Sequence, residues 1–206
     1  MLNLSRIREL LEPFGVALDP RQEAQLACYL NLLLRWNQRI NLTSVRSEED
    51  CVTRHFGESF YLAHFEDLSG CRLLDVGSGA GFPGLALKIM FPDIETTLLE
   101  PVAKKRAFLK EVVRSCGMDR VTARPERIEE IVLAKYNVAT VRAVGDLRSI
   151  VTSINRVLDP GGRLHLWISE KQRSELETSV FEWTRTLRIP LSREREIVTG
   201  VLRECA

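Results

Sequence analysis

The sequence of 206 residues contains no hydrophobic run long enough to cross a membrane and no pattern typical of a signal peptide. A membrane-spanning helix needs about 20 consecutive apolar residues. The N-terminal segment MLNLSRIREL is amphipathic instead of a charged stretch followed by an apolar block. These absences predict a cytoplasmic protein that makes no use of a membrane.

The sequence also lacks any arrangement of cysteines that would bind zinc or form a disulfide framework. Its five cysteines are odd in number, widely separated and never spaced as CxxC. We therefore predict reduced thiols and no metal site; the cysteines are Cys28, Cys51, Cys71, Cys116 and Cys205.

Net charge is almost absent too, at +1, so total charge does not identify a partner. Positive charge is nevertheless concentrated between residues 102 and 127, where eight lysines and arginines accompany three acidic residues. This cationic segment includes Lys104 and Lys105. It is either the solvated face of a helix or a surface that binds RNA.

Two patterns of hydrophobic residues divide the chain near Ser69 and Gly70. Residues 1–69 carry apolar residues at helical spacing, with Asp19 and Pro20 as the cap and first turn of a long helix. We predict a small helical N-terminal module over residues 1–69 and a second domain over residues 70–206.

The second domain alternates short β-rich runs with helical patterns, which is typical of a doubly wound, mostly parallel sheet. Predicted helices cover Gly84–Met90, Val102–Cys116 and Leu147–Leu158. The α/β sheet is expected to have seven strands and to end in an antiparallel hairpin; the strands are Cys71–Val76, Ile94–Leu99, Val121–Ala123, Val138–Arg142, Arg163–Ile168, Thr186–Pro190 and Glu196–Leu202.

The segment LLDVGSGAGFPGLALKI, residues 73–89, matches two glycine-rich cofactor motifs. One is the GxGxxG of dinucleotide-binding turns, and the other is the acid-led glycine loop of methyltransferases. Asp75 favours the second motif, because a carboxylate at the strand tip would repel a pyrophosphate but would attract the ammonium and sulfonium groups of S-adenosylmethionine. The predicted cofactor-binding residues at this loop are Asp75, Gly77, Gly79 and Phe82.

Glu100 ends the next predicted strand, about 20 residues beyond the loop, which is the separation expected for an acid that binds ribose hydroxyls. This spacing occurs in either cofactor class, so it supports a ribose without choosing between them. A solvated acid at a strand end is the alternative. The segment Asp159–Gly162 further on predicts a tight turn into a strand.

These motifs together resemble the Rossmann-like class I S-adenosylmethionine-dependent methyltransferases. The chain is most similar to one family, the bacterial ribosomal RNA small-subunit methyltransferase G family, also called glucose-inhibited division protein B. The similarity extends nearly end to end and lies in Arg35–Asn37, Asn41–Arg46, Arg54–Phe56 with Glu58 and Ser59, Asp75–Gly84, Lys104–Leu109, Arg127–Glu130, and Arg142 with Ala143.

The resemblance implies methylation of guanine N7 in the decoding-region loop of 16S ribosomal RNA, either as free RNA or in the small ribosomal subunit. It implies that Gly77 and Phe82 line the cofactor site and that Glu100 binds its ribose. It also implies that Ile128 and Glu129 flank the adenine and that Arg142 lies near the point of transfer. A monomer is expected.

The sequence departs from the family pattern at three positions. Ile168 stands where the family usually has a lysine, Glu58 replaces an aspartate, and Glu196 replaces a histidine. The cofactor motifs are unaffected by these changes, which concern the side of the site that faces the substrate.

Two motifs of other methyltransferases are absent from the sequence, which limits the kinds of methyl transfer that we expect. The fourth predicted strand is not followed by the Asn/Asp-Pro-Pro-Tyr/Phe motif of exocyclic-amine methylation, and no Pro-Cys dipeptide supports a covalent cysteine mechanism. Guanine N7 needs no proton removal, so positioning and electrostatics suffice. We predict that Arg142 is catalytic and also belongs to the cofactor-binding residues, with a structural ion pair as the alternative. We predict that RNA is bound by Arg54, His55, Lys104 and Lys105.

Three functions remain open from the sequence. The first is a ribosomal RNA methyltransferase, the second is a small-molecule methyltransferase on the same fold, and the third is a noncatalytic relative that binds cofactor or ribosome. The cationic segment 102–127 favours RNA.

Overall fold

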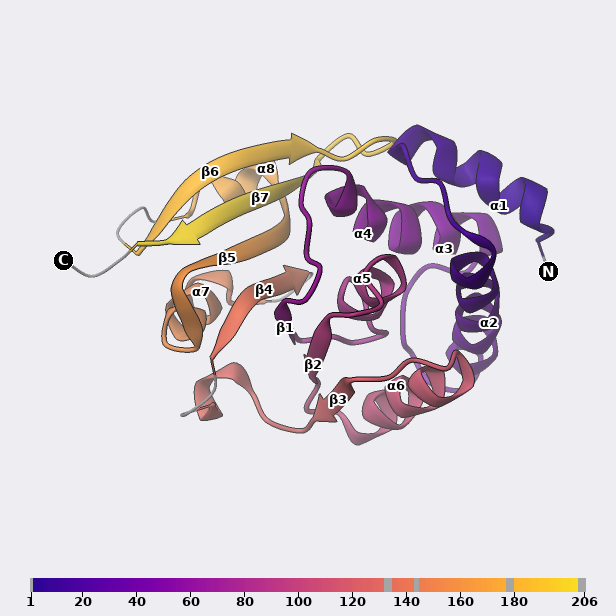
Figure 1. The fold of residues 1–206 in the computed structure, drawn as a ribbon, viewed down its shortest axis with the longest axis horizontal. Coiled ribbons are helices and arrows are strands. Elements are labelled where there is room, and N and C mark those ends of the chain that lie inside the picture. The colour runs from indigo at the N-terminus through magenta and orange to yellow at the C-terminus, as the bar shows by residue number, and fades with distance from the viewer. Residues whose placement is uncertain (1, 132–134, 143–144, 177–179, 204–206) are drawn as a thin grey trace.

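A computed structural model describes residues 2–131, 135–142, 145–176 and 180–203. Figure 1 shows a twisted central sheet with helices packed against it. Ala143 and Cys205, named above, lie outside the described residues. The helical elements before the sheet are α1 (Leu4–Leu11), η1 (Glu12–Phe14), α2 (Pro20–Asn37), α3 (Glu48–Cys51), the π-helix η2 (Val52–Gly57), α4 (Glu58–Phe60) and η3 (Tyr61–His64).

Helix α2 begins where the sequence predicts. The Asp19 carboxylate accepts a hydrogen bond from the backbone N–H of Gln22 at 2.8 Å, and the Gln22 side chain accepts one from the Asp19 N–H at 2.9 Å. Pro20 occupies the first helical position, where no backbone donor is needed. This reciprocal cap fixes the start of the helix that later contacts the glycine loop.

The sheet has the order β3-β2-β1-β4-β5-β7-β6, and the last two strands run antiparallel. The predicted seven-stranded fold with a C-terminal hairpin is therefore confirmed. Strand order reverses between β1 and β4, which is where open α/β sheets bind ligands. The strands are β1 (Arg72–Val76), β2 (Glu95–Leu99), β3 (Val121–Arg124), β4 (Tyr136–Arg142), β5 (Leu158–Ser169), β6 (Phe181–Arg188) and β7 (Arg195–Leu202).

The connecting helices follow the predicted alternation; α6 is one residue shorter than predicted at each end, and α7 differs more. They are α5 (Gly84–Met90), α6 (Ala103–Ser115), η4 (Ile128–Glu130), α7 (Leu147–Asn155) and α8 (Glu170–Arg173). Helix α7 ends three residues before the predicted Leu158, which instead pairs with Tyr136 at the start of β5. The predicted turn Asp159–Gly162 is thus an irregular part of a strand, with Gly161 at a φ of 72°.

Three apolar clusters cover the two faces of the sheet. Adjacent residues of β1 show the division, since Leu73 and Leu74 belong to clusters on opposite sides. The largest cluster joins the N-terminal helices to α5 and α6, and it contains Leu26, Phe56 and Phe108. The helical module therefore shares a core with the sheet, and the division at residues 69 and 70 stays a prediction.

His165 lies in the middle of β5, fully buried, with Nδ1 3.0 Å from the Thr199 hydroxyl. Desolvation, and then the charges of Arg163 and Arg185, lower its pKa to about 3. An unfolded histidine binds a proton near pH 6.5. The folded state therefore loses stability as the pH falls below 6.5, because only the unfolded chain takes up this proton.

We expect His165 to cost about 2 kcal/mol of unfolding free energy between pH 7.5 and pH 5. Urea denaturation of the wild type and of His165→Asn at both pH values measures it. The variant should lose about 2 kcal/mol less than the wild type over this range. Equal losses would show that His165 is not held neutral.

The described residues contain no helix that is long and apolar enough to span a bilayer. They also contain no group of three potential metal-ligating side chains. Four of the cysteines, Cys28, Cys51, Cys71 and Cys116, are free thiols.

Candidate functional site

The glycine loop connects β1 to α5 at the point where strand order reverses. Gly77, Gly79 and Gly81 have φ values of 69°, 56° and 90°, a left-handed conformation that glycine adopts at little cost. A Cβ atom at Gly81 would lie 2.8 Å from the Leu85 side chain and would also collide with the Tyr29 hydroxyl. The sequence of the loop is therefore dictated by both backbone conformation and close packing.

Asp75 lies beneath this loop and not in front of it. Its side chain is fully buried, and Oδ1 accepts a hydrogen bond from the Thr140 hydroxyl of β4 at 2.7 Å. A Cβ atom added to Gly84 would come within 2.8 Å of Asp75 Oδ2. Burial raises the pKa of Asp75 to about 6. Asp75 is fully buried and does not line the groove, so its direct contact with the cofactor stays a prediction.

Glu100 connects the end of β2 to the glycine loop. One carboxylate oxygen accepts the Gly79 N–H at 2.9 Å, and the other accepts the Val102 N–H at 2.8 Å. Each oxygen keeps a second lone pair, so the carboxylate can hold the loop and still accept hydroxyl donors. This geometry suits the predicted role in binding ribose.

A groove of about 480 Å³ opens above the carboxyl ends of the strands. This volume falls within the usual range for cofactor pockets. Its polar lining divides into two groups. The first is the glycine loop with Glu100; the second consists of Thr43, Ser44, Arg54, His55, Lys105, Arg142, Trp167, Ser169, Gln172 and Arg195.

Three parallel rings link the N-terminal module to the groove. Tyr29 stacks on Phe82 at a centroid distance of 5.1 Å, and Phe82 stacks on His55 at 4.8 Å. The Tyr29 hydroxyl donates to the carbonyl of Ala80 in the loop. The sequence indicated only that α2 is amphipathic, and nothing in the spacing distinguished Tyr29 from an ordinary core residue.

His55 is neutral at physiological pH. Burial lowers its pKa to about 3, with further lowering from the charges of Arg142, Arg54 and Arg195 in that order. Its Nε2 lies 2.8 Å from the Thr43 hydroxyl. With so low a pKa, His55 would be a weak proton acceptor, and it is better suited to packing and hydrogen bonding.

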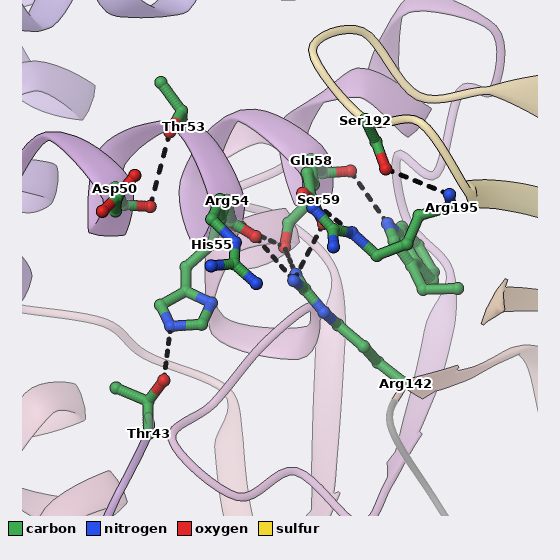
Figure 2. Close-up of polar contacts among 11 residues, drawn as sticks. Thr43, Asp50, Thr53, Arg54, His55, Glu58, Ser59, Arg142, Ser192 and Arg195 are labelled. Carbon is green, nitrogen blue, oxygen red and sulfur yellow. Dashed lines mark hydrogen bonds and ion pairs between the residues drawn. The ribbon is translucent and has the colours of Figure 1, made fainter. Parts of the chain in front are cut away.

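Arg142 ends β4 and reaches back to the π-helix η2, as Figure 2 shows. Its Nη2 donates to the carbonyl of Arg54 at 2.5 Å and to the Glu58 carboxylate at 2.9 Å. The side chain is 13% exposed and Glu58 is 2% exposed. Arg142 therefore forms a structural ion pair and also lines the groove, and its catalytic role stays a prediction.

The structure brings together most of the predicted site residues. Gly77, Gly79, Phe82, Glu100, Arg54, His55, Lys105 and Arg142 all line the groove, whereas Asp75, Lys104, Ile128 and Glu129 do not. Ile128 is buried in the 3-10 helix η4, where it packs in a core cluster, and Glu129 is exposed. Their roles beside the adenine remain predictions.

Several lining residues were not predicted as site residues, and three of them have large polar side chains. Arg195, Trp167 and Gln172 come from the C-terminal part of the chain, far in sequence from the glycine loop. Ile168 and Glu196, two of the departures from the family pattern, are direct partners across β5 and β7. The Glu196 carboxylate accepts a hydrogen bond from Arg173 Nε at 2.8 Å, so its negative charge is paired with a neighbouring arginine.

A model of the rRNA small subunit methyltransferase G family matches residues 22–195. The chain belongs to this family. It is 39% identical over 161 residues to the Ribosomal RNA small subunit methyltransferase G of Chloroflexus aggregans, covering 76% of this chain and 68% of that protein. It is 43% identical to the protein of the same name from Aquifex aeolicus, covering 70% and 75%.

Solved structures agree with the fold. A SAM dependent methyltransferase from Aquifex aeolicus superposes with a TM-score of 0.61 at 16% identity, covering 74% of this chain and 93% of that one. The cofactor is S-adenosylmethionine. The residues fit it: positive-φ glycines leave backbone open to the groove, and Glu100 is positioned beside them.

Proposed function

We propose that this member of the methyltransferase G family methylates N7 of a guanine in the decoding-region loop of 16S ribosomal RNA. The observation that carries the proposal is the groove itself. It joins a cofactor-binding loop to a cluster of arginines, and its described lining contains four cations and one carboxylate. Such a charge distribution favours a polyanionic acceptor.

The glycine loop and Glu100 hold the cofactor at one end of the groove. Gly77 and Gly79 provide backbone close to the ligand, while Glu100 receives the ribose hydroxyls and keeps the loop against β2. S-adenosylmethionine supplies a methyl group activated by the positive charge of its sulfonium. Asp75, held by Thr140 under the loop, shapes the turn from below.

The acceptor end needs no general base, because guanine N7 carries a free lone pair. The groove matches this requirement: Glu100 is the one carboxylate in its described lining, and two backbone N–H groups already bind it. His55, with its pKa near 3, is a poor base as well. Arg142 holds the guanine through O6 or an adjacent phosphate, so positioning and electrostatics carry the reaction.

The partner is the RNA of the small subunit, free or assembled, and the protein acts as a cytoplasmic monomer. Lys105, at the start of α6, extends the cationic lining toward the segment 102–127. Arg54 and His55 contribute from η2.

A transfer assay tests the proposal. Methyl-labelled S-adenosylmethionine is offered with 16S RNA, with 30S subunits and with 23S RNA, all from a strain that lacks the enzyme. Label should enter the small-subunit substrates and not 23S RNA. Tight cofactor binding with no transfer to either small-subunit substrate would contradict the proposal and would favour a noncatalytic binding protein.

A further inference from the structure

Glu58 is shared by two arginines that come from β4 and β7, two strands separated by β5 in the sheet. Arg195, at the start of β7, donates to it through Nε at 3.1 Å and through Nη2 at 2.5 Å, and Arg142 donates at 2.9 Å from the end of β4. Figure 2 shows both guanidinium groups converging on this single carboxylate. Glu58 is itself fixed, because its carbonyl accepts Trp167 Nε1 at 2.8 Å.

This arrangement leaves positive charge uncompensated. Arg54 is exposed on η2, and among the described residues no hydrogen bond or ion pair engages its guanidinium. Arg54, Arg142 and Arg195 all line the groove, and Glu58 is a carboxylate that pairs with two of them, Arg142 and Arg195. A partly buried excess of cations is unfavourable unless an anion joins it.

Suitable donors remain available for that anion. The recorded hydrogen bonds of Arg195 use Nε and Nη2, which leaves Nη1, and those of Arg142 use Nη1 and Nη2, which leaves Nε. Guanidinium groups bind phosphate oxygens through several directed hydrogen bonds. The Glu58 carboxylate fixes the two guanidinium groups before any ligand arrives, which lowers the cost of ordering them.

We infer that Arg195, Arg142 and Arg54 form a binding site for one phosphate of the acceptor nucleotide. Glu58 positions the guanidinium groups of Arg195 and Arg142 in this site. The inference rests on the proposed function for the identity of the acceptor. It goes further by assigning to Arg195, from the C-terminal hairpin, a role in binding the RNA backbone. A phosphate held here would fix the nucleotide next to the neutral ring of His55, which lines the same end of the groove.

The test compares guanosine 5′-monophosphate with guanosine, because the two differ only in the phosphate. Their affinities are measured by calorimetry on the full chain with S-adenosylhomocysteine bound. The monophosphate should bind about tenfold more tightly than the nucleoside, as expected for a pair of charge-assisted hydrogen bonds. Arg195→Ala should reduce this preference to about twofold or less.

Two further variants make the result specific. Arg54→Ala, which removes no recorded structural contact, should also weaken the preference, so the inference stays testable if Arg195→Ala folds poorly. Arg188→Ala is the matched control, since Arg188 is an exposed arginine of β6 outside the groove. This control should retain the full preference for the monophosphate.

Equal affinity for nucleotide and nucleoside, or no measurable binding of the monophosphate, overturns the inference. So does a preference that survives both Arg195→Ala and Arg54→Ala. The outcomes separate the two proposals. A preference for the monophosphate without methylation of any small-subunit RNA would support the phosphate site and reject the proposed acceptor. Methylation of small-subunit RNA without this preference would support the proposed acceptor and reject the phosphate site.

Discussion

Arg142→Ala is expected to slow methyl transfer roughly 100- to 1,000-fold while changing the affinity for S-adenosylmethionine by less than about threefold. Arg142 provides directed donors at the acceptor end of the groove, and removing one preorganised donor typically costs this much in rate. The cofactor end should be unaffected, because the recorded hydrogen bonds of Arg142 go to Arg54, Glu58 and Ser59 and not to the glycine loop. Single-turnover kinetics and cofactor calorimetry measure the two quantities separately.

Arg124→Ala provides the control for this experiment. Arg124 also ends a parallel strand, but it is paired with Glu126 and does not line the groove. The control should keep nearly normal transfer. If Arg142→Ala weakens transfer and cofactor binding equally, Arg142 has a general structural role and is not part of the acceptor site.

Glu100→Ala is expected to weaken cofactor binding roughly 10- to 100-fold, with little change in the rate at saturating cofactor. The carboxylate accepts the N–H groups of Gly79 and Val102, and its removal leaves both donors without their partner. Loss of the ribose contact adds to this cost. Calorimetry with S-adenosylhomocysteine measures the affinity without turnover.

Glu95→Ala is the matched control, because Glu95 lies at the opposite end of the same strand and is exposed. Its affinity for the cofactor should equal that of the wild type. A Glu100→Ala protein that binds cofactor normally would remove Glu100 from the site. If Arg142→Ala mainly lowers the rate of methyl transfer and Glu100→Ala mainly lowers the affinity for the cofactor, the two ends of the groove have different functions.

The position of the glycine loop and Glu100 at the groove could be predicted well, because it depends on features that are local in sequence. Their contact with the cofactor stays a prediction. Left-handed turns need glycine, and the strand that follows the loop must place an acid beside it, so Gly77, Gly79 and Glu100 can be read directly from the sequence. Asp75 was harder. Its position at the strand tip is visible in the sequence, but the direction of its side chain depends on Thr140 in a strand 65 residues away.

The acceptor end depends on contacts between distant segments, and the sequence predicted it only in part. The resemblance to the family led to Arg142, Arg54 and His55. Arg195 was not predicted as a site residue, and it reaches the groove because β7 inserts between β5 and β6. Tyr29 likewise reads as a core residue, and its contact with Ala80 follows only from the packing of α2 against the loop.

The pairing of Ile168 with Glu196 shows the same limitation. As separate departures from the family pattern they have no evident relation, but the β5–β7 register places them directly opposite each other. The Arg173 side chain then neutralises Glu196 from α8. The two substitutions thus belong to one local environment, which the linear sequence could not reveal.

The position of the methyl group on the RNA tests the central claim most directly. 16S RNA methylated by the enzyme would be digested to nucleosides and analysed by mass spectrometry, and the modified site would be mapped by chemical cleavage at 7-methylguanosine. We predict a single 7-methylguanosine in the decoding-region loop, with far less of it in RNA incubated for the same time with Arg142→Ala. Methylation on an exocyclic amine, on ribose or at another loop would contradict the account.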